Sequence, residues 1–243
     1  MDVCSLSDVG LVRSHNEDAC ACGNLPGGAW AVVCDGMGGA NAGEVASQTA
    51  VEIIARGLVE EYQEGCTDNK IKYLMSFLGY EANAKIYRLA EEQEKLQGMG
   101  TTLVMAVVTR GIAHIVYAGD SRAYLLTKEG ARQLTTDHSM VQELVDLGDL
   151  TPEEAKVHPQ KNIITRALGV HAVIDLDYLE SHMGEDDRLL LCSDGLTNYV
   201  DTDQMYQLSL ELDGPAYLQR LVELAKEAGG NDNITAAMIG NGS

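Results

Sequence analysis

The sequence predicts an α+β fold in which two mostly antiparallel sheets pack together and helices cover both outer faces. Three observations support this prediction. Apolar runs of strand length dominate the beginning and the middle of the chain, short Gly-containing turns join consecutive runs, and long stretches with helical spacing are confined to a few places. A four-layer αββα sandwich would bury all of these apolar faces. The sequence lacks the regular alternation of strand and helix that is typical of parallel-sheet folds.

The N-terminal part predicts three strands followed by two long helices. The strands are expected near 2–5, 17–23 and 29–34, and the last is a continuous apolar run. Apolar residues then recur every three or four positions, which places them on one face of a helix. They are Ala46, Ala50, Ile53, Ile54, Gly57 and Leu58 in the first helix, and Ile71, Leu74, Leu78, Ala82, Ile86 and Leu89 in the second.

The middle and the end of the chain return mainly to strands. Arg110-Gly111 and the Lys128–Gly130 segment are hairpin turns, so the strands that they join are antiparallel. Thr151 and Pro152 provide the N-cap and first residue of a short helix. The expected strands are 102–109, 112–118, 122–127, 131–134, 162–167, 173–179, 187–193 and 233–239, and the expected helices are 140–147, 152–157 and 218–228.

Length, composition and charge limit the possible functions. No linker divides the 243 residues, so a single domain is expected over 1–243. The 37 acidic and 17 basic residues give a net charge of −20, and clustered basic residues for binding nucleic acid are absent from the sequence. No apolar stretch approaches the ~20 residues that span a bilayer, and the first fifteen residues lack signal-peptide character. We therefore expect a cytoplasmic monomer without membrane insertion and with reduced cysteines.

Acidic residues recur at the ends of predicted strands. Asp35, Asp120 and Asp194 each follow an apolar run, and Asp232 comes just before the last strand. A single Asp-Gly pair is an ordinary turn. Several carboxylates on one rim of a sandwich would repel each other unless a cation lay between them. An oxygen-only ligand set favours Mg²⁺ or Mn²⁺ over zinc or copper, so the pattern predicts a divalent metal centre.

Six ordered motifs resemble the metal-dependent Ser/Thr protein phosphatases of the PPM family (protein phosphatase 2C-like). The resemblance covers about 3–239, and the Asp-Gly-Met-Gly-Gly motif is similar to that of the compact bacterial type. The family implies an αββα sandwich with Mn²⁺ or Mg²⁺ between its sheets. The motifs are Arg13-x-x-Asn16-Glu17-Asp18, Asp35-Gly36-Met37-Gly38-Gly39, Gly100-Thr101-Thr102, Gly119-Asp120-Ser121-Arg122, Ser193-Asp194-Gly195 and Gly230-Asn231-Asp232-Asn233.

The resemblance also implies roles for individual residues. Asp35 would bridge two metal ions, with the Gly36 carbonyl as a further ligand, while Asp194 and Asp232 would bind the second ion. Asp120 would hold a third, weaker ion together with Asp194. Glu17 and Asp18 would act through metal-bound water, and the planar fork of Arg13 would bind the phosphate.

The implied reaction is hydrolysis of phosphoserine and phosphothreonine in proteins, opposing a cognate Ser/Thr protein kinase. A hydroxide bridging the metals would attack phosphorus, so no protein nucleophile is required. Two positions depart from the family pattern: Met37 replaces the histidine of eukaryotic relatives, and Ala40 replaces a histidine that is frequent in bacterial ones. The segment 136–166 matches a mobile flap, which makes Asp137, His138 and Ser139 candidate substrate-side residues, although a histidine before a helix, like His138, is more often a cap or surface group.

Three alternatives compete with this interpretation. A haloacid-dehalogenase-like phosphatase would use Asp175 and Asp177, but only eight residues separate Asp177 from the acidic residue Asp186, too few for helical crossovers. A cysteine-dependent phosphatase needs Cys-x5-Arg, and none of the six cysteines has an arginine six positions later. An inactive binding module of the same fold remains the stronger alternative, although such proteins usually lose metal ligands.

Overall fold

The computed structural model describes residues 1–39 and 42–240, which form two antiparallel sheets. One sheet has the strand order β1-β11-β10-β7-β8. The other has the order β2-β3-β5-β6-β9, with β4 paired to the end of β3. The strands are β1 (Asp2–Asp8), β2 (Asp18–Leu25), β3 (Gly28–Met37), β4 (Gly100–Thr101), β5 (Leu103–Thr109), β6 (Ile112–Ala118), β7 (Arg122–Thr127), β8 (Gly130–Gln133), β9 (Asp177–His182), β10 (Arg188–Cys192) and β11 (Ile234–Gly240).

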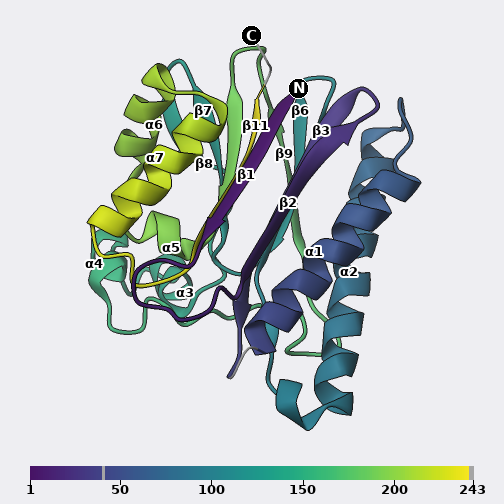
Figure 1. Cartoon of the computed structure of the whole chain (residues 1–243), viewed down its shortest axis with the longest axis vertical. Helices are drawn as coiled ribbons and strands as arrows, with labels where there is room; N and C mark the ends of the chain where they lie inside the picture. Colours follow the sequence, from purple (N-terminus) through teal and green to yellow (C-terminus); the bar gives the residue numbers. More distant parts are fainter. Residues whose placement is uncertain (40–41, 241–243) are drawn as a thin grey trace.

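Helices cover both outer faces of the paired sheets (Figure 1). On one flank lie α1 and α2, and on the other lie α6 and α7, so the four-layer αββα prediction is confirmed. The helices are α1 (Ala42–Glu61), α2 (Asp68–Glu92), the 3₁₀ turn η1 (Glu94–Leu96), α3 (Met140–Asp146), α4 (Pro152–Val157), α5 (Asp194–Thr197), α6 (Thr202–Glu211) and α7 (Gly214–Glu227). None of the described helices combines the length and apolar character needed to span a bilayer.

Three apolar clusters lie between the four layers. The first packs α1 and α2 against the outer face of the sheet containing β3, the second fills the space between the sheets, and the third packs α7 against the other sheet. Strand β3 shows how the sequence divides its side chains between two clusters. Trp30 and Val32 face the helices, whereas Ala31 and Val33 face the other sheet. This alternation places Asp35 on the inter-sheet face.

The structure corrects several predicted boundaries. The segment 162–167 is not a strand, and its only pairing in the described chain is an isolated bridge between Ser139 and Ile164. The strand predicted at 173–179 is instead Asp177–His182, an edge strand whose side chains are mostly half-buried and therefore give a weak apolar signal. Helix α6 was not predicted because Met205 is its only buried residue.

Asp35 also lies differently from its prediction. It is inside β3, not after it, because the strand continues to Met37 by pairing with β4. Asp194 likewise does not sit in a simple turn, since it is the first residue of α5.

Candidate metal centre and active site

A pocket of about 290 Å³ opens at the ends of strands that lie opposite the two chain termini. Strand β11 runs from the pocket to the end of the sheet where the chain terminates (Figure 1). Asp232, which lines the pocket, comes two residues before the strand begins, and Gly240 is its last residue. The pocket gathers segments that are far apart in the sequence. Its lining consists of Arg13, Glu17, Asp35, Gly36, Met37, Gly38, Thr102, Asp120, Asn162, Ile164, Asp194, Asp232 and Asn233.

Strand ends and short turns position the four aspartates of this pocket. Asp35 lies where β3 changes its pairing partner from β5 to β4. Asp120 lies in the turn between β6 and β7, and Asp194 follows β10 at the start of α5. The two sheets therefore deliver carboxylates from both sides to one end of the inter-sheet space.

The buried carboxylates make the pocket electrostatically unfavourable without a counter-charge. Burial raises the pKa of Asp120 to about 7, with a further contribution from the charge of Asp194. Burial and then the charge of Asp18 raise the pKa of Asp35 well above its ordinary value, and burial followed by Asp232 raises that of Asp194. Bound cations would relieve this repulsion.

Asp18 lies beside the pocket and does not line it. It is buried on β2, and the hydroxyl of Ser193 donates a hydrogen bond of 2.8 Å to its Oδ2. Burial raises the pKa of Asp18 to about 7, and the charge of Asp194 adds to the effect. Glu17, the adjacent predicted residue, does line the pocket.

Thr102 connects two of the pocket's acidic segments. Its Oγ1 accepts a hydrogen bond of 2.9 Å from the backbone N–H of Asp35 and lies 2.7 Å from the Ser121 hydroxyl. Its own N–H donates to the Asp35 carbonyl at 2.8 Å. Ser121 follows Asp120, so Thr102 links the backbone of Asp35 to the side chain next to Asp120. Sequence reasoning assigned no role to Thr102, although it lies in a quoted motif.

Asn233 holds the loop that carries Arg13 and Glu17. Its Oδ1 accepts the Glu17 N–H at 2.8 Å, and its Nδ2 donates to the carbonyls of Val9 and His15 at 3.0 Å each. The sequence motifs did not assign a specific role to Asn233 either. Its amide supplies a donor and an acceptor at once, which explains the need for Asn at this position.

Arg13 reaches the pocket from this loop. Its Nη2 donates to Asp232 Oδ2 at 2.9 Å, and its side chain is half-exposed. The charge of Asp232 raises the pKa of the Arg13 guanidinium, so it stays positive. Among the residues described in the pocket lining, Arg13 therefore supplies a positive charge to the acidic groups.

The donor set fits a hard divalent cation. Within residues 1–39 and 42–240, no three His, Cys, Asp or Glu side chains form a preformed ion cage. The pocket instead presents four mutually repelling aspartates, and histidine and cysteine are absent from its described lining. A Cβ on Gly36 would collide with the backbone oxygens of Glu17 and Gly43, so only glycine permits this close backbone packing. These features suit Mg²⁺ or Mn²⁺.

The three candidate residues of the flap-like segment point elsewhere. Asp137 makes a bidentate ion pair with Arg122, at 2.9 and 2.6 Å. Ser139 caps α3 by accepting the Gln142 N–H at 3.3 Å. None of the three lines the pocket, whereas Asn162 and Ile164 of the same segment do.

His138 is buried and forms hydrogen bonds with the backbone of Gly119, the residue before Asp120. Its Nδ1 accepts the Gly119 N–H at 3.1 Å, and its own N–H donates to the Gly119 carbonyl at 2.9 Å. The opposite ring nitrogen lies 3.3 Å from Asp177 Oδ2, and the ring stacks on Tyr117. We therefore interpret His138 as a structural residue and not as a substrate-side one.

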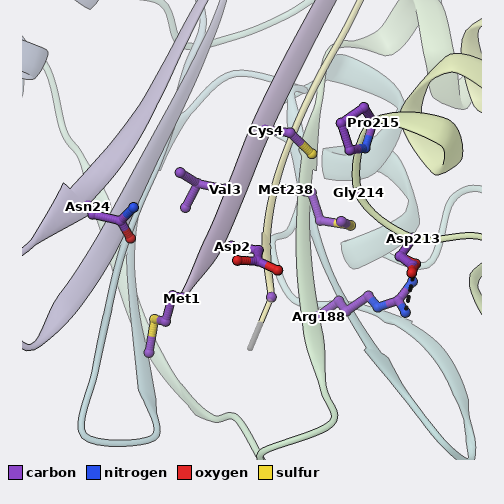
Figure 2. A pocket seen from close by; sticks show the side chains of 11 residues that line it. Met1, Asp2, Val3, Cys4, Asn24, Arg188, Asp213, Gly214, Pro215 and Met238 are labelled. Atoms are coloured by element: carbon purple, nitrogen blue, oxygen red, sulfur yellow. Dashed lines mark ion pairs between the residues drawn. The ribbon is translucent and has the colours of Figure 1, made fainter. Parts of the chain in front are cut away.

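Met37 lines the pocket at the position discussed from the sequence, while Ala40 lies outside the described residues. A second, larger pocket of about 500 Å³ lies beside the N-terminal end of β1 (Figure 2). Arg188 and Asp213 face each other there across 3.8 Å. No predicted site residue lines this second pocket.

Carboxylates and an arginine that meet between the sheets of an αββα sandwich define the class of metal-dependent phosphatases, as the sequence resemblance implied. Residues 12–237 match the family model described as "Protein phosphatase 2C". The chain belongs to this family.

Named relatives and solved structures agree with this assignment. The chain is 38% identical to the "Serine/threonine phosphatase stp" of Listeria welshimeri, over 96% of this chain and 93% of the relative. It is similar to the crystal structure of the Ser/Thr phosphatase Stp1 from Staphylococcus aureus, with a TM-score of 0.91 and 33% identity over 100% of this chain and 95% of that one. It also resembles the catalytic domain of the phosphatase PstP in complex with two manganese ions, with a TM-score of 0.83 and 36% identity over 98% and 96% of the two chains.

Proposed function

We propose that this chain is a metal-dependent protein serine/threonine phosphatase that hydrolyses phosphoserine and phosphothreonine in proteins. The observation that carries the proposal is the meeting of Asp35, Asp194 and Asp232 with Arg13 in one pocket. An inactive binding module of the same fold would not need to retain this set. The enzymatic interpretation is therefore favoured.

The acidic residues would hold Mn²⁺ or Mg²⁺. Asp35 and the Gly36 carbonyl would contribute to one ion, Asp35, Asp194 and Asp232 to a second, and Asp120 with Asp194 to a third, weaker one. When bound, the cations lower the pKa of water and neutralise charge on the phosphoryl oxygens. Glu17 and Asp18 would orient water molecules in the surrounding shell.

Arg13 would position the phosphate group. Its guanidinium offers parallel N–H donors that match two phosphoryl oxygens. It is half-exposed at the mouth of the pocket, where a phosphorylated side chain can reach it. The described lining contains no histidine, so the departing serine or threonine oxygen would take its proton from water in the pocket.

The wider context follows from the proposed reaction. Its substrates would be phosphorylated proteins made by a cognate Ser/Thr kinase, and it would act in the cytoplasm. Residues 1–243 would form one domain, because β1 and β11 from the two ends of the chain are neighbours in one sheet. The residues that line the described pocket belong to one chain, so a monomer would carry the proposed site.

Hydrolysis of p-nitrophenyl phosphate and a phosphothreonine peptide, with chelator or with added Mn²⁺, Mg²⁺ or Zn²⁺, tests the proposal. We expect activity with Mn²⁺ or Mg²⁺ and none with chelator. Replacing Asp35 and Asp194 together by Asn should reduce turnover by roughly 1,000-fold or more. Mn²⁺-stimulated turnover in that double variant would contradict the mechanism, and an inactive wild type at saturating Mn²⁺ would support the binding module.

A further inference from the structure

The side chain of Asn198 joins a proposed metal ligand to the flap-like segment 136–166. Its Nδ2 donates a hydrogen bond of 3.0 Å to Oδ2 of Asp194, four residues earlier. Its Oδ1 accepts a hydrogen bond of 3.0 Å from Nζ of Lys161, 37 residues earlier. Asn198 directly follows α5, and Lys161 lies in the loop after α4, at the same end of the sheets (Figure 1). One amide therefore connects a carboxylate of the pocket to a cation of the flap-like segment.

The two contacts require one orientation of the Asn198 amide. An ammonium group only donates hydrogen bonds, and an ionised carboxylate only accepts them. The amide oxygen must therefore face Lys161 while the NH2 group faces Asp194, as the structure shows. An aspartate at this position would repel Asp194, and an apolar side chain would bond to neither partner. The pair of contacts thus explains why an exposed position carries Asn.

Lys161 belongs to a stretch that borders the pocket. Asn162 and Ile164 line the pocket, so we call residues 161–164 the flap wall. A backbone hydrogen bond of 2.8 Å joins the carbonyl of Ile163 to the start of α3. That contact lies inside the flap-like segment, whereas the hydrogen bond of Lys161 reaches α5 outside it. The flap wall is thus tied to the helix that begins with a proposed metal ligand.

The position of the Asp194 carboxylate depends on what fills the pocket. Without ions, Asp194 shares the pocket with Asp35, Asp120 and Asp232, and like charges repel. Bound cations would remove this repulsion and hold the carboxylate in place. Hydrogen bonds from neighbouring groups orient metal ligands, and their loss lowers metal affinity by about 10- to 100-fold. Ion binding and the contact from Asn198 would therefore reinforce each other.

We propose that Asn198 is a positioning residue that couples divalent-ion binding at Asp194 to the order of the flap wall through Lys161. An ion that fixes the carboxylate also fixes the amide, and the amide then holds the ammonium group. Coupling between two sites is reciprocal, so a flap wall that is held in place also strengthens ion binding. The coupling rests on the proposed function, because it needs the metal centre, and it adds the residues that connect that centre to the flap-like segment.

Hydrogen–deuterium exchange of the whole chain, with chelator or with saturating Mn²⁺, tests the coupling. The N–H groups of Lys161 and Ile163 are hydrogen-bonded within the flap-like segment, so their exchange reports its opening. In wild type, Mn²⁺ should slow exchange in the flap wall by roughly 3- to 10-fold, the effect of one strengthened hydrogen bond. Lys161→Met keeps the length of the side chain without its donor and should lose this slowing.

Two further variants make the exchange measurement specific. Lys161→Arg keeps a cationic donor for the Asn198 amide and should retain the Mn²⁺-dependent slowing. Lys156→Met is the matched control, because Lys156 is an exposed lysine of α4 in the same flap-like segment. It should behave as wild type.

Calorimetric titration with Mn²⁺ measures the coupling from the metal side. Asn198→Leu should raise the dissociation constant for Mn²⁺ by about tenfold or more, because the donor to Asp194 is lost, and it should also lose the slowing of exchange. Lys161→Met should raise the dissociation constant by roughly threefold or more, since the coupling is reciprocal. Thermal unfolding in chelator verifies that each variant is folded.

Flap-wall exchange that is the same with chelator and with Mn²⁺ in wild type would overturn the coupling, and so would equal slowing in wild type and Lys161→Met. Neither measurement depends on turnover. An active enzyme without Mn²⁺-dependent exchange would therefore contradict only the coupling. A chain that shows Mn²⁺-dependent exchange through Lys161 but hydrolyses no phosphopeptide would contradict only the proposed function.

Discussion

The guanidinium Nη2 of Arg13 lies 2.9 Å from Oδ2 of Asp232, so the proposed phosphate-binding residue is paired with a proposed metal ligand. The two residues are 219 positions apart in the sequence, and their pairing brings the loop after β1 to the loop before β11. In this arrangement the arginine neutralises one carboxylate of the acidic pocket. When the proposed ligands bind, Asp232 would bind a metal ion and Arg13 would bind the phosphate group.

Replacing Arg13 by Ala should weaken phosphate binding without weakening metal binding. We expect kcat/KM for a phosphopeptide to fall by about 10- to 100-fold, because two charge-assisted hydrogen bonds are lost. Arg13→Lys should give an intermediate value, since it keeps the charge but not the planar fork. Steady-state kinetics and calorimetric Mn²⁺ titration provide the measurements.

Arg56→Ala, on the exposed side of α1, is the matched control and should behave as wild type. Mn²⁺ affinity that drops in parallel with kcat/KM in Arg13→Ala would show that Arg13 supports the metal centre and not the phosphate.

A methyl group at Gly36 should damage the site while a methyl group at Gly39 should not. The Cβ of Gly36→Ala would collide with backbone oxygens of Glu17 and Gly43, whereas nothing lies within 4 Å of a Cβ on Gly39. We expect Gly36→Ala to lower stability by roughly 1–3 kcal/mol, as for overpacking, and to abolish most activity. Urea unfolding and phosphatase assays of both variants check this. Equal behaviour of the two variants would refute the close-approach argument.

The sequence predicted the layers and most of the pocket because both depend on local patterns. The continuous apolar run of β3 predicts a buried strand, and the ordered Asp-containing motifs identify Asp35, Asp120, Asp194 and Asp232. The path of a loop over the pocket leaves no such local pattern in the sequence. Asn162 and Ile164 border the pocket through the course of a loop, and the expected strand there does not form.

The hydrogen bonds between residues distant in the sequence could not be predicted from the sequence either. Nothing local to His138 shows that its ring accepts the N–H of Gly119, which is 19 residues away. The flap resemblance placed this histidine near substrate, but tertiary contacts place it inside the fold. A polar ring such as that of His138 can be buried only where it has hydrogen-bond partners, so its burial cannot be predicted until those partners are known.

Asp18→Asn should stabilise the metal-free protein at high pH. The pKa of Asp18 is about 7 in the folded chain and near 3.8 when unfolded, so the folded state binds the proton more tightly. Stability from this group is present at low pH and is lost as pH rises from about 4 to about 7. The variant keeps an acceptor for Ser193 and removes the charge. Its advantage over wild type should be on the order of 2–4 kcal/mol at pH 8 and should vanish near pH 4.

Urea unfolding in the presence of chelator, at several pH values, measures this difference. Glu60→Gln, an exposed site on α1, is the control and should leave the wild-type pH profile unchanged. An advantage of Asp18→Asn that is constant with pH would contradict the assignment.

His138→Ala should loosen the turn that carries Asp120 and thereby raise the Mn²⁺ concentration needed for full activity. The ring Nδ1 of His138 accepts the Gly119 N–H, and the main-chain N–H of His138 donates to the Gly119 carbonyl. Gly119 has a φ of +107°, which few other residues adopt. Because the backbone N–H of residue 138 remains, Gly119 loses only the hydrogen bond that its own N–H donates to Nδ1. We expect an activation constant for Mn²⁺ that is about tenfold higher, since one buried donor is left unpaired.

His138→Asn separates positioning from mere packing. Its Oδ1 can accept the Gly119 N–H as Nδ1 does, while the stacking of the ring on Tyr117 is lost in both variants. Both variants should therefore show a similar loss of thermal stability, and only His138→Ala should show the altered Mn²⁺ dependence. Titration of activity with Mn²⁺, together with thermal unfolding in chelator, distinguishes the two effects. If the Mn²⁺ dependence of both variants equals that of wild type, His138 supports packing alone.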